Sequence, residues 1–215
     1  MAARLNRDPQ APPYWQEACQ ALSALHPTWA RLIATYPERA LRSRGAPFET
    51  LLRSLVGQQI SVKAAEAVWG RVLLTMGGSV SSATILGLSE EALRATGLSR
   101  QKVLYAKALS EFDQAGELSL SRLAALDDSA CIHHLCRVKG IGPWTAQMFL
   151  MFGLRRPDVW PVDDIGVQRG ISMQFFDGQP IGPKEALQFG EKLKPWRTVA
   201  AWYLWRSLDP AVVDY

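Results

Sequence analysis

Cysteine is scarce in this chain: its 215 residues include three, Cys19, Cys131 and Cys136. Three thiols cannot form a disulfide framework, and an all-cysteine zinc site or an iron–sulfur cluster needs one thiolate more. We therefore expect no iron–sulfur cluster and no required cofactor, and a reducing cytoplasm is the simplest location.

Long apolar runs are also missing. The densest stretch, Met148–Leu154, falls far short of the roughly eighteen consecutive apolar residues that a membrane-spanning helix needs. Residues 1–12 contain no apolar core of a secretory signal, so we expect them to form a flexible leader. With 48% hydrophobic and 20% charged residues, the composition is that of a folded globular protein.

Acidic residues are absent from the segment 129–157, which contains Arg137, Lys139, Arg155 and Arg156. The chain as a whole carries a formal net charge of +4. A local excess of positive charge favours binding to nucleic acid phosphates, although the modest total charge does not require it.

Strand-like alternation is weak, and its only candidates are the short stretches 79–84 and 158–162. Helix signals, in contrast, recur along the chain. Proline stands where first turns would begin, serine precedes apolar periodic segments, and glycine follows them; examples are Pro47, Ser61, Ser99, Gly116, Pro143 and Pro183. The pattern predicts an all-α protein of roughly ten helices.

One turn between two predicted helices carries the strongest functional signal. The first helix ends before Gly140-Ile141-Gly142, and the second begins at Pro143. Glycines permit a tight turn, and the amides at the start of the second helix can bind a phosphate without reading base sequence. An ordinary helix–helix turn could look the same, but the basic segment around it favours a DNA-binding hairpin at 139–145, with Lys139, Gly140, Gly142 and Thr145 as candidate contacts.

Four segments together resemble the helix-hairpin-helix (HhH-GPD) DNA glycosylase superfamily, and within it the alkylpurine (3-methyladenine) glycosylase II branch. They are GQQISVKAA at 57–65, KGIGPWTAQMF at 139–149, DVWPVDDIGVQRG at 158–170 and KPWRTVAAWYLW at 194–205, in the order of the family. The resemblance implies two helical lobes with a cleft between them, in the minimal form without an N-terminal β domain.

The family pattern also implies how the lobes divide the chain. Residues 13–215 are expected to form a single two-lobed domain. Its middle lobe would comprise 48–130, and its second lobe 13–47 plus 131–215, which would carry both the hairpin and the catalytic aspartate.

Asp163 and Asp164 are the candidate catalytic residues. Cleavage of an N-glycosidic bond builds positive charge on the deoxyribose, and an ionised carboxylate can stabilise that charge and orient water. Both stand at the start of a predicted helix, whose dipole favours an ionised carboxylate, and one of them could merely cap it. The resemblance implies that Asp164 is catalytic, with Asp163 as the alternative.

Trp144, Trp205 and Met148 match positions that line the base pocket in the family, although tryptophans on helices usually belong to the core. An indole face suits a cationic alkylated purine. Met148 replaces a tyrosine of the classical bacterial enzyme, so the range of substrates is expected to differ. Bifunctional relatives carry a lysine where this chain has Trp144, so the resemblance implies a monofunctional enzyme without lyase activity.

The loop Gln58-Gln59 precedes Ser61, which is expected to cap the next helix and to contact a phosphate. A polar helix end is the simplest interpretation of the two glutamines. The resemblance implies instead that Gln59 is a wedge that fills the space left by the flipped base, with Gln58 beside it at the DNA interface.

Relatives often hold Na⁺ or K⁺ in the hairpin through backbone carbonyls, and Cys136, Val138 and Ile141 match those positions. Carbonyls require no particular side chain, so the sequence does not test this. The resulting expectation is a monomeric enzyme that flips alkylated purines from duplex DNA and hydrolyses the glycosidic bond in base excision repair. A non-catalytic helix-hairpin-helix protein that binds DNA damage, a bifunctional glycosylase for oxidised bases and a tryptophan-rich scaffold are the alternatives.

Overall fold

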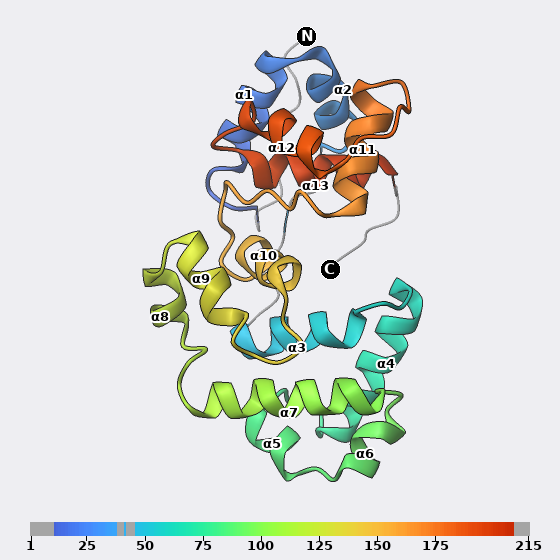
Figure 1. Cartoon of the computed structure of the whole chain (residues 1–215), viewed down its shortest axis with the longest axis vertical. Coiled ribbons are helices and arrows are strands. Elements are labelled where there is room, and N and C mark those ends of the chain that lie inside the picture. The colour runs from blue at the N-terminus through green and yellow to red at the C-terminus, as the bar shows by residue number, and fades with distance from the viewer. Residues whose placement is uncertain (1–10, 38–40, 42–45, 209–215) are drawn as a thin grey trace. The chain divides into compact units, whose positions relative to one another are not determined.

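The computed structural model describes residues 11–37, 41 and 46–208, so most of the expected leader lies outside the described residues. The part described contains thirteen helices and no strand (Figure 1). No helix within it is long and apolar enough to cross a membrane. The helices are α1 (Trp15–Leu25), α2 (Pro27–Thr35), α3 (Pro47–Gly57), α4 (Val62–Thr75), α5 (Ser82–Gly87), α6 (Glu90–Ala95), α7 (Arg100–Gln114), α8 (Leu120–Ala125), α9 (Asp128–Leu135), α10 (Pro143–Phe152), α11 (Ile165–Phe175), α12 (Pro183–Glu191) and α13 (Arg197–Leu208).

The predicted helix starts are confirmed by their caps. The hydroxyls of Ser61, Ser89 and Ser99 each accept a hydrogen bond from the amide three residues ahead, at the beginnings of α4, α6 and α7. Proline occupies the first turn of α2, α3 and α12. Both devices suit the helix N-terminus, where amides lack partners within the helix.

The short helix α5 lies where a strand was a candidate, at 79–84. Ser81 has an extended backbone and precedes the helix, and Ile85 is fully buried. Because α5 packs along α7, tertiary contact decides the conformation of a stretch whose own pattern is ambiguous. The other candidate, 158–162, is also not a strand in the structure.

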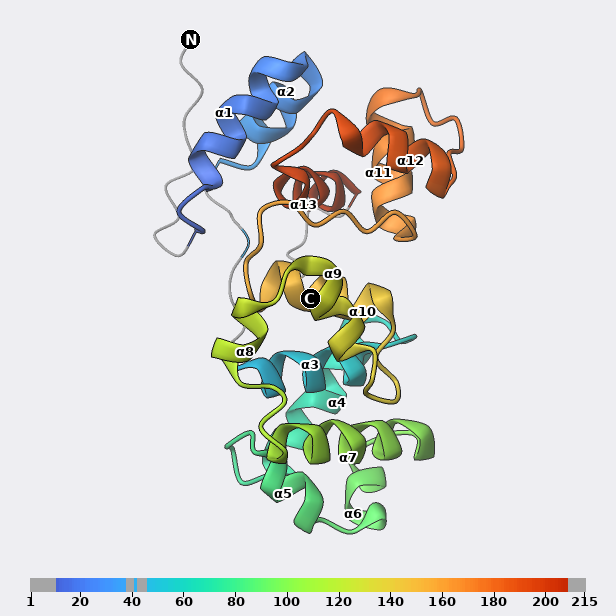
Figure 2. The same ribbon diagram turned by 60° about the vertical axis from the view of Figure 1, so that its left-hand side comes forward.

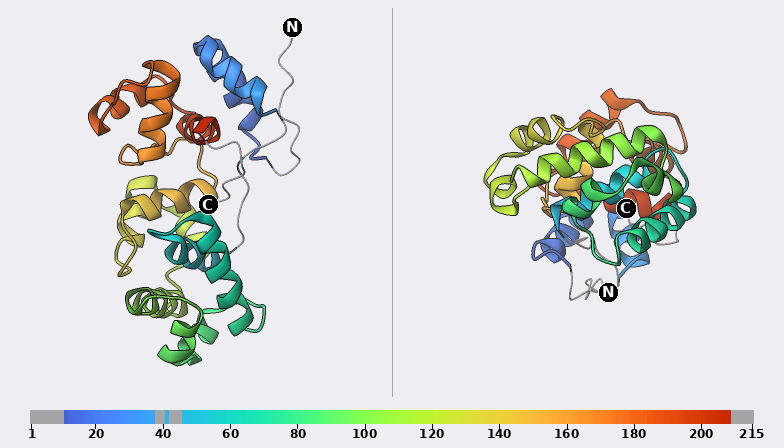
Figure 3. Two further views of the ribbon diagram at one scale, coloured as in Figure 1. Left: turned by 90° about the vertical axis from the view of Figure 1, so that its right-hand side faces the viewer. Right: turned by 90° about the horizontal axis from the view of Figure 1, so that it is seen from below.

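The described residues divide into two compact units: the first comprises 11–37, 41 and 150–208, and the second comprises 46–149. Residues 131–149 therefore belong with 46–130, whereas the family pattern had assigned them to the lobe that carries Asp164. Within the first unit, α11 packs on α12 and α13. Within the second unit, α5 and α6 pack on α7 (Figures 2 and 3).

The first unit contains α1, α2, α11, α12 and α13. Its core is rich in aromatic residues: Trp15 and Tyr203 are fully buried, and Trp15 meets Trp202 edge-on with ring centroids 5.3 Å apart. Trp29 packs against Phe175 from α11. Such pairs add roughly 0.5–1.5 kcal/mol beyond the burial of their area. Most tryptophans of this unit are thus structural, as expected for Trp202.

The second unit is organised around α7, which packs on α3, α5 and α6. Leu51, Leu52 and Leu55 of α3 and Leu109 of α7 are buried in its core. Leu51, Leu52 and Leu55 follow helical spacing, so α3 presents one apolar face to α7. Near its start, α7 carries Lys102, which contacts the carbonyls at the end of α3.

Candidate active site

Asp164 is the N-cap of α11. Its Oδ1 accepts a hydrogen bond of 2.8 Å from the backbone amide of Val167. A carboxylate at this place interacts favourably with the positive end of the helix dipole. Asp163, the alternative catalytic residue, is exposed and precedes the cap. The capping role that the sequence left open between the two aspartates therefore belongs to Asp164.

Trp205 of α13 contacts the same carboxylate. Its indole Nε1 donates a 2.8 Å hydrogen bond to Oδ1 of Asp164, and its ring stacks on Phe152 at a centroid distance of 6.2 Å. Two residues that the sequence placed in separate motifs are thus brought together, 41 positions apart. Two donors on one carboxylate oxygen fix the orientation of the side chain more firmly than a cap alone.

Gly166 allows this contact. A Cβ at position 166 would lie 2.9 Å from Cδ1 and 3.0 Å from Nε1 of Trp205, and 3.0 Å from Oδ1 of Asp164. Any larger residue would therefore press the indole and the carboxylate apart. Sequence reasoning did not single out Gly166. The available signal was a glycine just inside a helix, where it costs stability and often marks a close approach.

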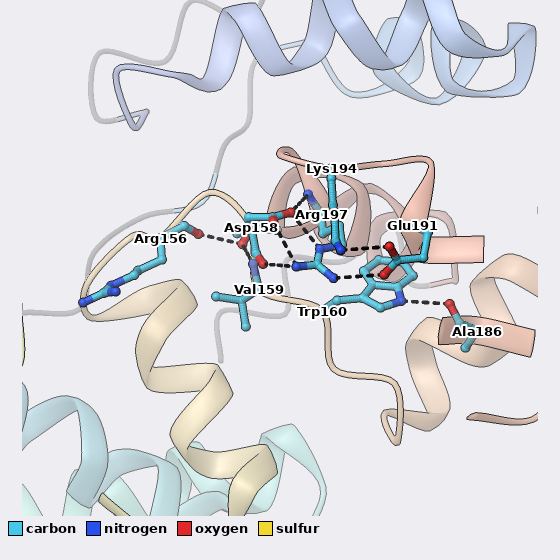
Figure 4. Close-up of polar contacts among 9 residues, drawn as sticks. Arg156, Asp158, Val159, Trp160, Ala186, Glu191, Lys194 and Arg197 are labelled. Atoms are coloured by element: carbon cyan, nitrogen blue, oxygen red, sulfur yellow. Dashed lines mark hydrogen bonds and ion pairs between the residues drawn. The ribbon is translucent and has the colours of Figure 1, made fainter. Parts of the chain in front are cut away.

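The segment before Asp164 is anchored to α13 (Figure 4). The Arg197 guanidinium binds the Asp158 carboxylate through Nε at 2.7 Å and Nη2 at 2.9 Å. The Thr198 hydroxyl accepts from the Val159 amide at 3.0 Å and donates to the Arg156 carbonyl at 2.6 Å. The charged pair and the bridging hydroxyl hold the backbone that leads to the catalytic candidate.

Trp160 anchors the same segment to α12. Its indole donates to the carbonyl of Ala186 at 2.9 Å, and a Cβ at Gly190 would lie 2.3 Å from its Nε1. Figure 4 shows the indole beside the helix at this point. Trp160 is therefore held by a hydrogen bond and by close packing, which gives the segment two attachments, one on each of two helices.

The predicted hairpin lies between α9 and α10. Gly140 has φ of 94°, a value that L side chains rarely adopt, and a Cβ there would lie 2.3 Å from the Tyr105 ring. Lys139 is exposed next to it, and Pro143 begins α10 after Gly142. The positive φ and the contact with Tyr105 both require glycine at position 140, and both residues belong to the second unit. The turn places the N-terminus of α10 at the tip of the hairpin, as predicted.

Gln58 ties the loop after α3 to this hairpin. Its Nε2 donates to the carbonyl of Gly140 at 3.0 Å and to Oγ1 of Thr145 at 3.2 Å. Thr145 is buried. These two residues, expected at the DNA interface, contact the protein itself. Both bonds lie within the second unit.

Gln59 is exposed and has φ of 58°, in the left-handed region. Ile60 is 41% exposed, and Ser61 caps α4 as expected. A left-handed backbone is costly for a residue with a side chain, so the loop depends on its neighbours. Gln59 thus lies exposed in the turn between α3 and α4, with a backbone conformation that neither helix uses.

Trp144 and Met148 lie on α10 within the second unit. Trp144 is half-buried, whereas Met148 is 3% exposed and sits in the core. Trp205 and Asp164 belong to the first unit. A pocket that includes residues of both units stays a prediction.

The predicted cation would use the carbonyl oxygens of Cys136, Val138 and Ile141. The Val138 carbonyl accepts the Ile141 amide at 3.0 Å, and a carbonyl oxygen has a second lone pair for an ion. Neutral oxygen ligands suit a hard cation, so these residues fit it. No cluster of three His, Cys, Asp or Glu side chains that could hold a metal occurs among the residues that the structure describes.

Known proteins resemble the chain in both sequence and structure. Residues 52–195 match the family described as HhH-GPD superfamily base excision DNA repair protein. DNA-3-methyladenine glycosylase 1 of Schizosaccharomyces pombe is 33% identical over 195 residues, which are 86% of this chain and 84% of that protein. The chain spans 59% of the length of two further curated relatives, from Bacillus subtilis and Saccharomyces cerevisiae.

Two solved structures share the fold. The DNA-3-methyladenine glycosidase of Bacillus halodurans aligns with a TM-score of 0.79 and 35% identity, over 89% of each chain. The Schizosaccharomyces pombe 3-methyladenine DNA glycosylase in complex with abasic DNA aligns with a TM-score of 0.81 and 31% identity, over 93% of this chain and 98% of that one.

Proposed function

Since the chain belongs to the HhH-GPD superfamily of base excision DNA repair proteins, we propose that it is a monofunctional DNA-3-methyladenine glycosylase. It removes alkylated purines, such as 3-methyladenine and 7-methylguanine, from duplex DNA and leaves an abasic site. The observation that carries the proposal is Asp164, whose Oδ1 accepts hydrogen bonds from Val167 and Trp205.

Asp164 acts on the sugar. As the bond between C1′ and the base nitrogen breaks, its electron pair leaves with the base and positive charge builds on the deoxyribose. The carboxylate stabilises that charge, and water adds to C1′ and loses a proton. Because an alkylated purine is already cationic, it leaves as a neutral base and no general acid is required. The bonds from Val167 and Trp205 hold the carboxylate in a fixed orientation before the substrate arrives.

Trp205 also offers a surface for the base. Its ring is half-buried and stacked on Phe152, so one aromatic wall is already supported from behind. A cationic purine over an indole gains roughly 0.5–2 kcal/mol. On the family pattern, Trp144 of the second unit is also assigned to base contact, whereas Met148 is 3% exposed in the core of that unit.

The hairpin at 139–145 binds the DNA backbone, with Lys139 and the glycine turn at the phosphate. Gln59 fills the space left by the flipped base, and Ser61 lies next to it at the start of α4. A relative of similar fold has been solved in complex with abasic DNA, which supports DNA as the ligand of this chain. We also propose a monomer in the cytoplasm, consistent with three free cysteines.

The test is release of free bases from methylated duplex DNA by the wild type and by Asp164→Asn. Asparagine keeps an oxygen for the amide of Val167, so the cap survives while the negative charge is lost. We expect at least about a hundredfold loss of single-turnover rate with DNA binding retained. Asp163→Asn is the matched control and should remain active. If the wild type binds DNA but releases no base, the non-catalytic damage-binding alternative replaces the proposal.

A further inference from the structure

We infer that Lys102 is a positioning residue for the wedge, acting from α7 on the backbone of the loop that carries Gln59. The inference rests on the proposed function, since the wedge matters only if a base is flipped from a duplex. It assigns a role to a lysine that neither the sequence motifs nor the catalytic geometry includes.

The Lys102 ammonium donates to the carbonyl of Val56 at 2.7 Å and to that of Gln58 at 2.8 Å. Both carbonyls lie at the end of α3, where the last carbonyls lack partners within the helix and the dipole is negative. Burial lowers the pKa of Lys102. A lysine is thus partly removed from water to bind two backbone oxygens, 44 and 46 residues away in the chain.

The bond to the Gln58 carbonyl bears directly on Gln59. A peptide group is planar, so fixing the carbonyl of residue 58 also fixes the orientation of the amide of residue 59. Gln59 has φ of 58°, which costs energy for a residue with a side chain and persists only when its surroundings impose it. The ammonium supplies that constraint from outside the loop.

The same face of α7 also contacts the hairpin. Tyr105, three residues after Lys102, packs its ring against Gly140 closely enough that a Cβ there would overlap it. The Gln58 side chain bonds to the Gly140 carbonyl and to Thr145. Helix α7 therefore contacts both the wedge loop and the hairpin, and Gln58 joins the loop to the hairpin directly. All of these contacts lie within the second unit.

The test compares duplex with single-stranded substrate. A single strand has no partner base and little stacking to restore, so it needs no wedge. Lys102→Met should lower the single-turnover excision rate on methylated duplex by about tenfold, as for loss of a charge-assisted hydrogen bond, and leave the rate on single-stranded DNA unchanged. Lys107→Met removes the same charge from the same helix and should change neither rate. If Lys102→Met folds poorly, Lys102→Gln replaces it in the test. Glutamine is neutral and shorter than lysine, so the same loss of rate on duplex is expected.

Coupling to Gln59 separates positioning from general destabilisation. In a Gln59→Ala background, Lys102→Met should have no further effect on the duplex rate, because the residue it positions is gone. Additive losses, or equal losses on both substrates, would overturn the inference. The inference would also be overturned if Lys102→Met lowered by about one the slope of log binding constant against log salt concentration for undamaged duplex. That result would make Lys102 a phosphate contact. If the wild type released no base at all, the proposed function would fail instead.

Discussion

The surroundings of Asp164 in the first unit and of the hairpin in the second use hydrogen bonds differently. At Asp164, a backbone amide and an indole converge on one side-chain oxygen. At the hairpin, the side chains of Gln58 and Lys102 converge on backbone carbonyls. The first arrangement orients a charge that acts on a sugar. The second fixes the path of a backbone, which suits contact with phosphates that carry no sequence information.

The two regions also differ in why each needs a glycine. Gly140 is required by its positive φ and by the Tyr105 ring, whereas Gly166 has ordinary helical geometry and makes room for the Trp205 indole. Loss of Gly140 should therefore damage the fold of the DNA interface, while loss of Gly166 should damage mainly the chemistry.

The largest expected effect is that of Gly140→Ala. A side chain at φ of 94° against the Tyr105 ring should lower the free energy of unfolding by about 2–3 kcal/mol and weaken DNA binding. Denaturant unfolding and a binding titration measure both. Gly142→Ala is the control, because a Cβ there meets nothing within 4 Å. It should keep the stability of the wild type and lose only affinity for DNA; equal stability of the two variants would contradict the structure.

Arg197→Met should come next. It breaks the pair with Asp158 that anchors the segment leading to Asp164, at a cost of about 2 kcal/mol. For a chain of this size, the melting temperature should fall by about 4–8 °C. Lys194→Met removes a lysine whose pair with Glu191 is about half exposed, and should change the melting temperature little. Similar shifts for both variants would show that the anchor is no stronger than a surface pair.

Gly166→Ala should slow base release by about tenfold, because its Cβ displaces the indole that donates to Asp164. Affinity for abasic DNA should be retained. Gly170→Ala serves as the control: its Cβ would meet Leu204 on the same pair of helices, 2.8 Å away, without touching Asp164. We expect it to lower stability more than the excision rate. A normal rate for Gly166→Ala would show that the indole bond is dispensable.

Borohydride treatment should have no effect. Trp144 stands where a lyase would carry its amine, so no Schiff base forms and no protein–DNA adduct should be trapped with methylated duplex. Gel electrophoresis under denaturing conditions provides the measurement. A trapped adduct would show that an amine of the protein attacks the sugar, and would contradict the assignment as a monofunctional enzyme.

Local signals in the sequence were sufficient for much of the fold. Serine caps and first-turn prolines predicted most helix starts because capping depends on residues within one turn. The helix α5 was not predicted, since its stretch is short and its conformation follows from packing on α7. The family resemblance supplied Asp164, Trp205 and the hairpin as separate elements, without the bond that joins the first two.

By itself, the sequence determined the helical class, the hairpin turn and the family, because these depend on short motifs and their order. Only the tertiary structure decided that Asp164 is both the cap and the partner of Trp205, that Gln58 bonds to the hairpin, and that Lys102 holds the end of α3. Each of these bonds, except the cap, joins residues more than forty positions apart. Their geometry arises from helix packing, which no local pattern specifies.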